Sequence, residues 1–83
     1  MYVVVVYDAD PVERPNIRAV LKRQIHWIQQ SVFAGEVTKT AAEDLFDRLE
    51  QVVEDARVTF WMFERKPETR HIGEQDDEES IFL

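Results

Sequence analysis

The stretch Met1-Tyr2-Val3-Val4-Val5-Val6-Tyr7-Asp8-Ala9-Asp10 decides the fold, because β-branched and aromatic residues run through it without a helical period. We predict a strand that is buried on both faces and ends at two carboxylates. Asp8 follows the hydrophobic run directly and is a candidate for holding a metal ion; a turn cap is the alternative. Asp10 is better explained as a helix cap, because Asp10-Pro11-Val12-Glu13 resembles a capping box with proline at the first helical position.

Length and composition set the class of protein. A chain of 83 residues predicts one small domain, and a partner subunit is a reasonable way to complete its core. The absence of cysteine excludes disulfides and thiolate metal sites. No apolar run approaches the roughly 18 residues of a membrane span, and no basic, signal-like region precedes the first strand. We therefore expect a cytoplasmic protein with no membrane association.

The charge is distributed unevenly along the chain. A formal net charge of -7 argues against indiscriminate binding of nucleic acid. However, residues 11–40 carry an excess of basic side chains, whereas most acidic residues lie in residues 41–83. Arg14, Arg18 and Lys22 are four residues apart and form one basic ridge on the first predicted helix. This ridge is either a solvated helix flank or a surface that binds phosphates.

The rest of the chain alternates between helical and strand patterns. Apolar spacing predicts a first helix from Pro11 or Pro15 to Gln24. The segment 26–37 predicts two short strands with a bend between Ser31 and Gly35, because glycine tolerates unusual backbone angles. Thr38 or Thr40 caps a second helix, which is followed by a strand, Val58–Phe63, that is apolar on both faces.

The predicted order is strand, helix, strand, strand, helix, strand, which is the α+β ferredoxin-like βαββαβ arrangement. Two helices cover only one face of such a sheet, so the doubly apolar strands predict a homodimer through the sheet faces. We assign residues 1–73 to this domain, with a short additional C-terminal strand at Arg70–Gly73. Residues 74–83 form an acidic tail that ends in Ile81-Phe82-Leu83, either a docking strand or a disordered terminus.

Two segments together resemble the second universal CRISPR-associated protein, the Cas-two family. The first is Tyr2–Asp8, since the first strand of that family ends in Tyr-Asp. The second is Gln29-Gln30-Ser31-Val32-Phe33-Ala34-Gly35-Glu36-Val37-Thr38, against a family pattern of approximately Gln-x-Ser-Val-Phe-x-Gly-x-Leu/Val-Thr. The resemblance runs over nearly the whole chain and includes Ile72-Gly73.

The resemblance implies a ferredoxin-like homodimer with magnesium-dependent endonuclease activity on RNA or DNA. In that reading Asp8 of both protomers holds one Mg²⁺, and Tyr7 and Ser31 lie near the catalytic site. Oxygen ligands are those that magnesium prefers. Arg14 and Arg18 lie in the helix that supplies basic residues in the family, and the aromatic Phe33 is more readily explained by strand packing.

The resemblance also implies a CRISPR adaptation protein, which forms the dimeric core of the spacer-integration complex and binds protospacer DNA. Its implied partners are a second copy, the CRISPR integrase subunit and DNA or RNA. The alternative is a toxin-like ribonuclease or a regulatory dimer with no CRISPR role. His26 and His71 lack the spacing of metal ligands and are expected to be structural or surface residues.

Overall fold

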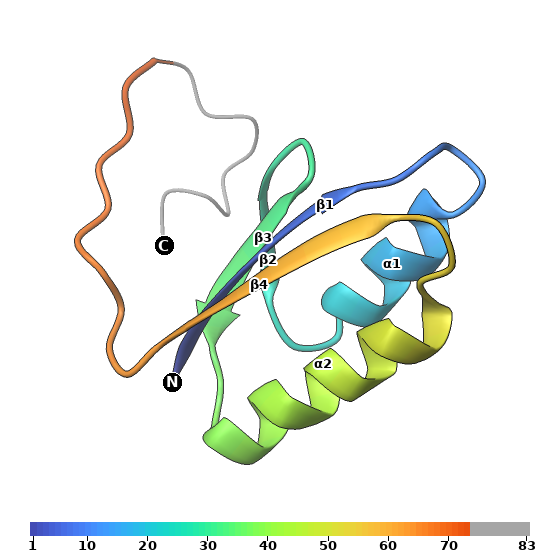
Figure 1. Ribbon diagram of the computed structural model, residues 1–83. Coiled ribbons are helices and arrows are strands. Elements are labelled where there is room, and N and C mark those ends of the chain that lie inside the picture. Colours follow the sequence, from blue (N-terminus) through green and yellow to red (C-terminus); the bar gives the residue numbers. More distant parts are fainter. Residues whose placement is uncertain (74–83) are drawn as a thin grey trace.

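The valine-rich N-terminal stretch forms β1, Tyr2–Asp8, an inner strand of a four-stranded antiparallel sheet with the order β2-β3-β1-β4. The computed structural model describes residues 1–73 (Figure 1). β1 pairs with β3, Val32–Glu36, on one side and with β4, Arg57–Phe63, on the other. β2, His26–Gln29, completes the sheet beside β3. The predicted βαββαβ order and the position of the first strand are confirmed.

Two helices cover one face of this sheet: α1, Arg14–Leu21, and α2, Lys39–Val52 (Figure 1). Side chains alternate along β1, so every second residue points toward the helices. Those residues are Val3, Val5 and Tyr7, each at most 2% exposed. They pack in one core with Ile17, Leu21, Ile25, Phe33, Ala42, Leu45 and Leu49. Burial of this apolar surface is the main force that holds the helices on the sheet.

A side-chain cap starts α2, whereas the turn that precedes α1 is held by Asp10. Asp10 Oδ1 accepts hydrogen bonds from the backbone N–H groups of Val12 and Glu13, each at 2.9 Å. The chain then turns once before α1 begins, with Pro15 in its first turn, where proline is tolerated. The Thr38 hydroxyl accepts from the Ala41 N–H at 3.1 Å. Asp10 therefore caps the turn before α1, but the predicted capping box is wrong, because the Glu13 carboxylate accepts hydrogen bonds from the backbone of residues 54–56. Thr38 is the cap of α2 rather than Thr40.

The β2–β3 hairpin turns earlier than the sequence predicted. The bend lies at Gln30 and Ser31, where Gln30 adopts a positive φ of 38°, and Gly35 lies inside β3. A Cβ atom at Gly35 would lie 2.9 Å from the Ile25 Cγ2 atom, which is closer than such atoms approach. Glycine is therefore required here by close packing against Ile25 and not by the bend, which reaches only Ser31, the first residue of the predicted interval.

The chain after β4 leads away from the sheet (Figure 1). Arg70–Gly73 forms no strand, so the additional strand expected there is absent from the single chain. The acidic tail, residues 74–83, lies outside the described residues. Within residues 1–73 the structure contains no helix with the length and apolarity needed to cross a membrane.

Candidate functional site

Asp8 is the last residue of β1, and its side chain points to the face of the sheet that the helices leave uncovered. It is exposed, and within residues 1–73 its carboxylate takes part in no hydrogen bond or ion pair. Arg57, the first residue of β4, lies directly opposite Asp8 in the antiparallel register. The carboxylate at the end of the central strand is therefore free to bind a ligand.

The loop that follows Asp8 is held by its own side chains. Asp10 accepts the two backbone N–H groups described above, and the Arg14 Nη2 atom donates to the carbonyl oxygen of Ala9 at 3.1 Å. Asp10 Oδ1 is thus occupied as a cap, as predicted. This leaves Asp8 as the carboxylate of the opening stretch with no protein partner among the described residues.

Tyr7 lies on the other face of β1, among the core side chains. It is 2% exposed, and its ring centroid is 6.3 Å from that of Phe33. Its hydroxyl is buried without a hydrogen-bond partner, as is the Nε atom of Arg18. Burial raises the pKa of the Tyr7 phenol, although the nearby Arg18 and Arg14 guanidinium groups lower it in part. The structure therefore does not bring Tyr7 and Asp8 together in one site.

Ser31 lies in the β2–β3 turn, beside the end of β1. Its carbonyl oxygen accepts a hydrogen bond from the Tyr7 N–H at 3.1 Å, and its side chain is half-buried. Phe33, two residues further on, is completely buried in the core, as the packing explanation predicted. Ser31 thus holds the backbone that precedes Asp8.

Arg14, Arg18 and Lys22 line one hollow on the surface of α1, with a volume of about 470 Å³ and with Pro11, Pro15 and Ala19 between them. The predicted basic ridge is therefore a continuous surface. Arg14 and Lys22 are exposed, whereas Arg18 is half-buried. A second hollow of about 200 Å³ adjoins it at Ala19 and brings two more arginines, Arg23 and Arg48, to the groove between the helices.

Sequence reasoning missed two residues beside Asp8. Arg57 is one, since only the β1–β4 register brings it opposite Asp8. The other is Glu13, which is 9% exposed and whose carboxylate accepts backbone N–H groups from the α2–β4 junction. These contacts join residues more than 40 positions apart, and nothing in the local pattern signals them.

The described part of the chain contains no group of three or more histidine, cysteine, aspartate or glutamate side chains that could hold a metal ion. Asp8 therefore belongs to no such cluster within residues 1–73, and water and phosphate oxygens would complete the coordination shell of an ion bound there. Mg²⁺ is commonly held in this manner, by one or two carboxylates together with substrate phosphates and several waters. His26 and His71 are both exposed and lie outside such a cluster.

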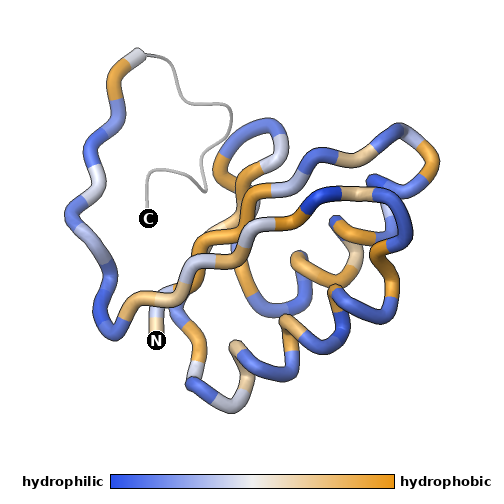
Figure 2. The backbone as a smooth tube through the Cα atoms, viewed as in Figure 1, coloured by the Kyte–Doolittle hydropathy of each residue, from blue (hydrophilic) through white to orange (hydrophobic). Residues whose placement is uncertain are grey.

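The face of the sheet opposite the helices is largely apolar. Trp61 and Phe63 of β4 are 46% and 37% exposed on it, beside the half-buried Val4 and Val6 of β1. Figure 2 shows apolar residues running along the strands, whereas the helices alternate between polar and apolar positions. Asp8 and Arg57 lie at one end of this uncovered face.

A family model described as "CRISPR associated protein Cas2" matches residues 1–70. The chain belongs to the Cas2 family. This confirms the family that the two sequence segments indicated. The ferredoxin-like fold is confirmed as well, since a crystal structure of Cas2 superposes with a TM-score of 0.82 at 33% identity, covering 92% of this chain and 90% of that one. Cas2 of Streptococcus pyogenes at pH 6.5 superposes with a TM-score of 0.64 at 30% identity, over 76% and 86% of the two chains.

Curated Cas2 relatives carry the name CRISPR-associated endoribonuclease Cas2. That of Methanosarcina acetivorans is 42% identical over 57 residues, which cover 68% of this chain and 64% of the relative. That of Methanocaldococcus jannaschii is 36% identical over 55 residues, covering 66% and 48%. The protein from Fusobacterium nucleatum is 35% identical over an alignment of 92 residues, covering 100% and 87%. The chain thus spans about half to two-thirds of the first two of these relatives.

Proposed function

We propose that this Cas2 chain is a homodimeric endonuclease of CRISPR adaptation that hydrolyses phosphodiester bonds of RNA or DNA at Asp8. The observation that carries the proposal is the free carboxylate at the end of the central strand, exposed beside an apolar face. The endoribonuclease names of the relatives agree with it. Tyr7 and Ser31, which the sequence also assigns to catalysis, remain predictions.

A second copy of the chain is the partner that best fits the uncovered face. Trp61 and Phe63 expose large apolar surfaces there, which water does not favour, while the helices already cover the opposite face. An isologous dimer would pair this patch with itself and bring the two copies of Asp8 to one interface. The dimer therefore supports both the solubility of the chain and the completeness of the site.

The donor set fits magnesium. Two copies of Asp8 would hold one Mg²⁺, which when bound supplies charge neutralisation and an activated water at the phosphodiester. Without a cation, two close carboxylates repel each other, so the dimer itself favours binding a divalent metal. Each carboxylate has no competing protein partner within residues 1–73.

A second role is favoured by the basic ridge. Arg14, Arg18 and Lys22 form one hollow surface, and a twofold axis would repeat it on both sides of the dimer. Such a ridge binds the phosphate backbone without reading sequence. We propose that it holds protospacer DNA while the dimer forms the core of the spacer-integration complex with the CRISPR integrase subunit.

The substitution Asp8→Asn tests the catalytic proposal, with Asp47→Asn, an exposed carboxylate on α2, as the matched control. We expect Asp8→Asn to abolish Mg²⁺-dependent cleavage of RNA and DNA, and Asp47→Asn to retain it. Cleavage that persists in Asp8→Asn would show that the assignment is wrong. Spacer integration that persists in the same variant would leave the scaffold role intact.

The alternative is a toxin-like ribonuclease or a regulatory dimer with no CRISPR role. Pull-down of the integrase subunit from the same genome separates the two. We expect a stable complex, whereas failure to form any complex would favour the alternative.

A further inference from the structure

Asp8 and Arg57 carry opposite charges at the same position of the β1–β4 ladder, yet they form no ion pair within the described residues. Residues that oppose each other in an antiparallel pair point to the same face, with Cβ atoms about 5 Å apart. Both side chains are exposed. The end of the uncovered face therefore presents one free carboxylate and one free guanidinium next to each other.

These two groups share a hollow. Its volume is about 380 Å³, and its lining combines the ends of β1 and β4 with the loop that follows Asp8: Asp8, Ala9, Asp10, Glu13, Asp55, Ala56 and Arg57. Arg57 is the basic residue of this lining. A metal-bound phosphodiester presents a cation and an anionic oxygen side by side, which matches a carboxylate beside a guanidinium.

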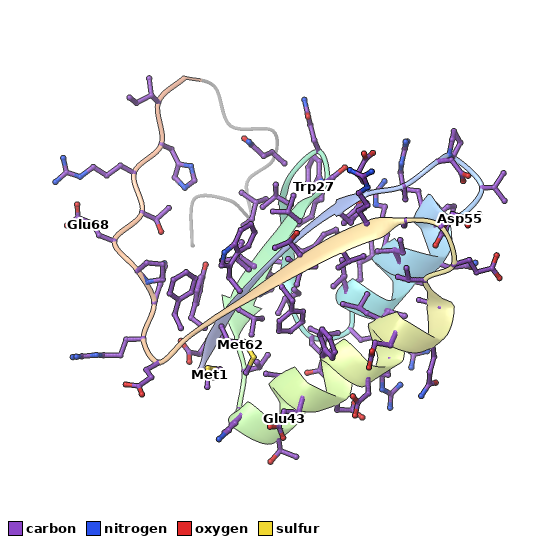
Figure 3. All side chains as sticks on the ribbon, in the orientation of Figure 1. Met1, Trp27, Glu43, Asp55, Met62 and Glu68 are labelled. Atoms are coloured by element: carbon purple, nitrogen blue, oxygen red, sulfur yellow. The ribbon has the colours of Figure 1, made fainter. Side chains whose placement is uncertain are left out.

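The position of Arg57 is set by Glu13. The Glu13 Oε2 atom accepts hydrogen bonds from the N–H groups of Glu54 at 2.6 Å and Ala56 at 3.3 Å, and Oε1 accepts from Asp55 at 3.2 Å. Three consecutive backbone donors thus hold one carboxylate that is 9% exposed. Figure 3 labels Asp55 at this junction, where the chain passes from α2 to β4. Arg57 follows directly, so the clamp fixes where β4 begins beside β1.

We propose that Arg57 binds the phosphate of the nucleic acid that is cleaved at Asp8, and that Glu13 is a positioning residue for Arg57. The inference rests on the proposed nuclease site. In this arrangement Asp8 would bind the metal ion that accompanies the phosphodiester, and the Arg57 guanidinium would donate hydrogen bonds to a non-bridging phosphate oxygen. Glu13 touches neither and acts through the backbone of residues 54–56.

The first test uses Arg57→Ala and Arg57→Lys, with Arg65→Ala as a matched control on an exposed arginine just beyond β4. The probe is a short single-stranded RNA of mixed sequence, bound in Ca²⁺ and cleaved in Mg²⁺. We expect Arg57→Ala to weaken RNA binding about tenfold, the loss typical of one hydrogen bond between charged groups. Arg57→Lys should recover part of the affinity, and Arg65→Ala should match the wild type.

Metal affinity distinguishes this role from simple neutralisation of Asp8. If Arg57 only neutralised Asp8, its removal would tighten Mg²⁺ binding and leave RNA affinity at fixed metal saturation unchanged; that result would overturn the proposal. If Asp8→Asn retains cleavage, the proposed nuclease site itself is wrong. If Asp8→Asn abolishes cleavage but Arg57→Ala binds RNA as tightly as the wild type, only the role of Arg57 is refuted.

The role of Glu13 has its own readout. Glu13→Ala should shift the amide NMR signals of residues 54–56, raise their hydrogen exchange and reproduce the weaker RNA binding of Arg57→Ala. Glu13→Gln retains one carbonyl acceptor and should partly restore both the protection of residues 54–56 from hydrogen exchange and the affinity for RNA. RNA affinity that stays at the wild-type level in Glu13→Ala, once the signals of residues 54–56 have moved, would show that the clamp does not position Arg57.

Discussion

Tyr7 and Asp8 are adjacent in the sequence, yet their side chains lie on opposite faces of β1: Tyr7 is 2% exposed in the core, and Asp8 is exposed on the uncovered face. The two residues of the Tyr-Asp pair that indicates the family therefore have different roles. Tyr7 joins the core beneath α1, and Asp8 delivers a carboxylate to the other side.

Replacing Tyr7 with phenylalanine should leave Mg²⁺-dependent cleavage within about twofold of the wild type, because the hydroxyl does not reach the face that carries Asp8. It should also leave the free energy of unfolding unchanged or raise it by about 1 kcal/mol, since it removes a buried hydroxyl that has no partner. Cleavage assays and urea denaturation measure the two effects. Loss of cleavage in Tyr7→Phe, but not in Tyr2→Phe, would instead support the catalytic role predicted from the sequence.

The stability of the fold should decrease in alkaline solution because of two buried tyrosines. Burial raises the pKa of Tyr7, and burial together with the Glu36 carboxylate raises the pKa of Tyr2, above the usual value of about 10. The folded chain therefore holds these protons more tightly than the unfolded chain does. This contribution to stability is complete below the unfolded pKa and is lost as the pH rises through the folded pKa.

Urea denaturation at pH 7 and above pH 10 measures this loss, and the double variant Tyr2→Phe/Tyr7→Phe is the control. We expect the midpoint to fall less steeply with pH in the double variant than in the wild type. Equal slopes in the two proteins would show that these phenols do not contribute.

The basic ridge should make the affinity for nucleic acid depend on the salt concentration. If Arg14, Arg18 and Lys22 each contact one phosphate, changing all three to alanine should make the negative slope of log K against log salt less steep by about 2 to 3. Fluorescence anisotropy of a DNA duplex over a salt titration gives this slope. The pair Arg65→Ala/Lys66→Ala removes exposed charge elsewhere and should change it far less; equal effects of the two sets would point to net charge alone.

The substitution Trp61→Glu should convert the proposed dimer into a folded monomer. A charge in the centre of a buried interface is unfavourable, whereas Trp61 is 46% exposed in the single chain and its loss should leave the core intact. Sedimentation and far-UV circular dichroism report the two properties. Val12→Glu, at a position that is 86% exposed in the loop before α1, is the matched control and should remain dimeric. A Trp61→Glu protein that stays dimeric would place the interface elsewhere.

The substitution Gly35→Ala should destabilise the chain by about 1 to 3 kcal/mol, the usual cost of overpacking. The new Cβ atom would lie 2.9 Å from Ile25 Cγ2 and 3.1 Å from Ile25 Cβ. Denaturant unfolding measures the change, and Ile25→Ala completes a double-mutant cycle. We expect Gly35→Ala to cost less in the Ile25→Ala background, because the contact with Cγ2 is removed while those with Ile25 Cβ and Cα remain. An equal cost in both backgrounds would show that the Cγ2 contact is not the cause.

Local patterns in the sequence predicted most of the fold. The valine run predicted β1, and the apolar spacing of α2 and the doubly apolar β4 identified the other main elements. Asp10 was recognised as a cap because capping depends on residues only two or three positions away. The same local reasoning failed at Gly35, since the atom that requires a glycine there belongs to Ile25, ten residues earlier.

By itself, the sequence determined the order of the elements, the family and the carboxylate that ends the first strand, since each depends on residues close together along the chain. The tertiary structure decided which side chains surround that carboxylate. Tyr7 turns away from Asp8 because strand residues alternate, and Arg57 and Glu13 come near it only through strand pairing and a clamp that joins residues 41 or more positions apart. Such contacts depend on register and packing, which no local pattern of residues encodes.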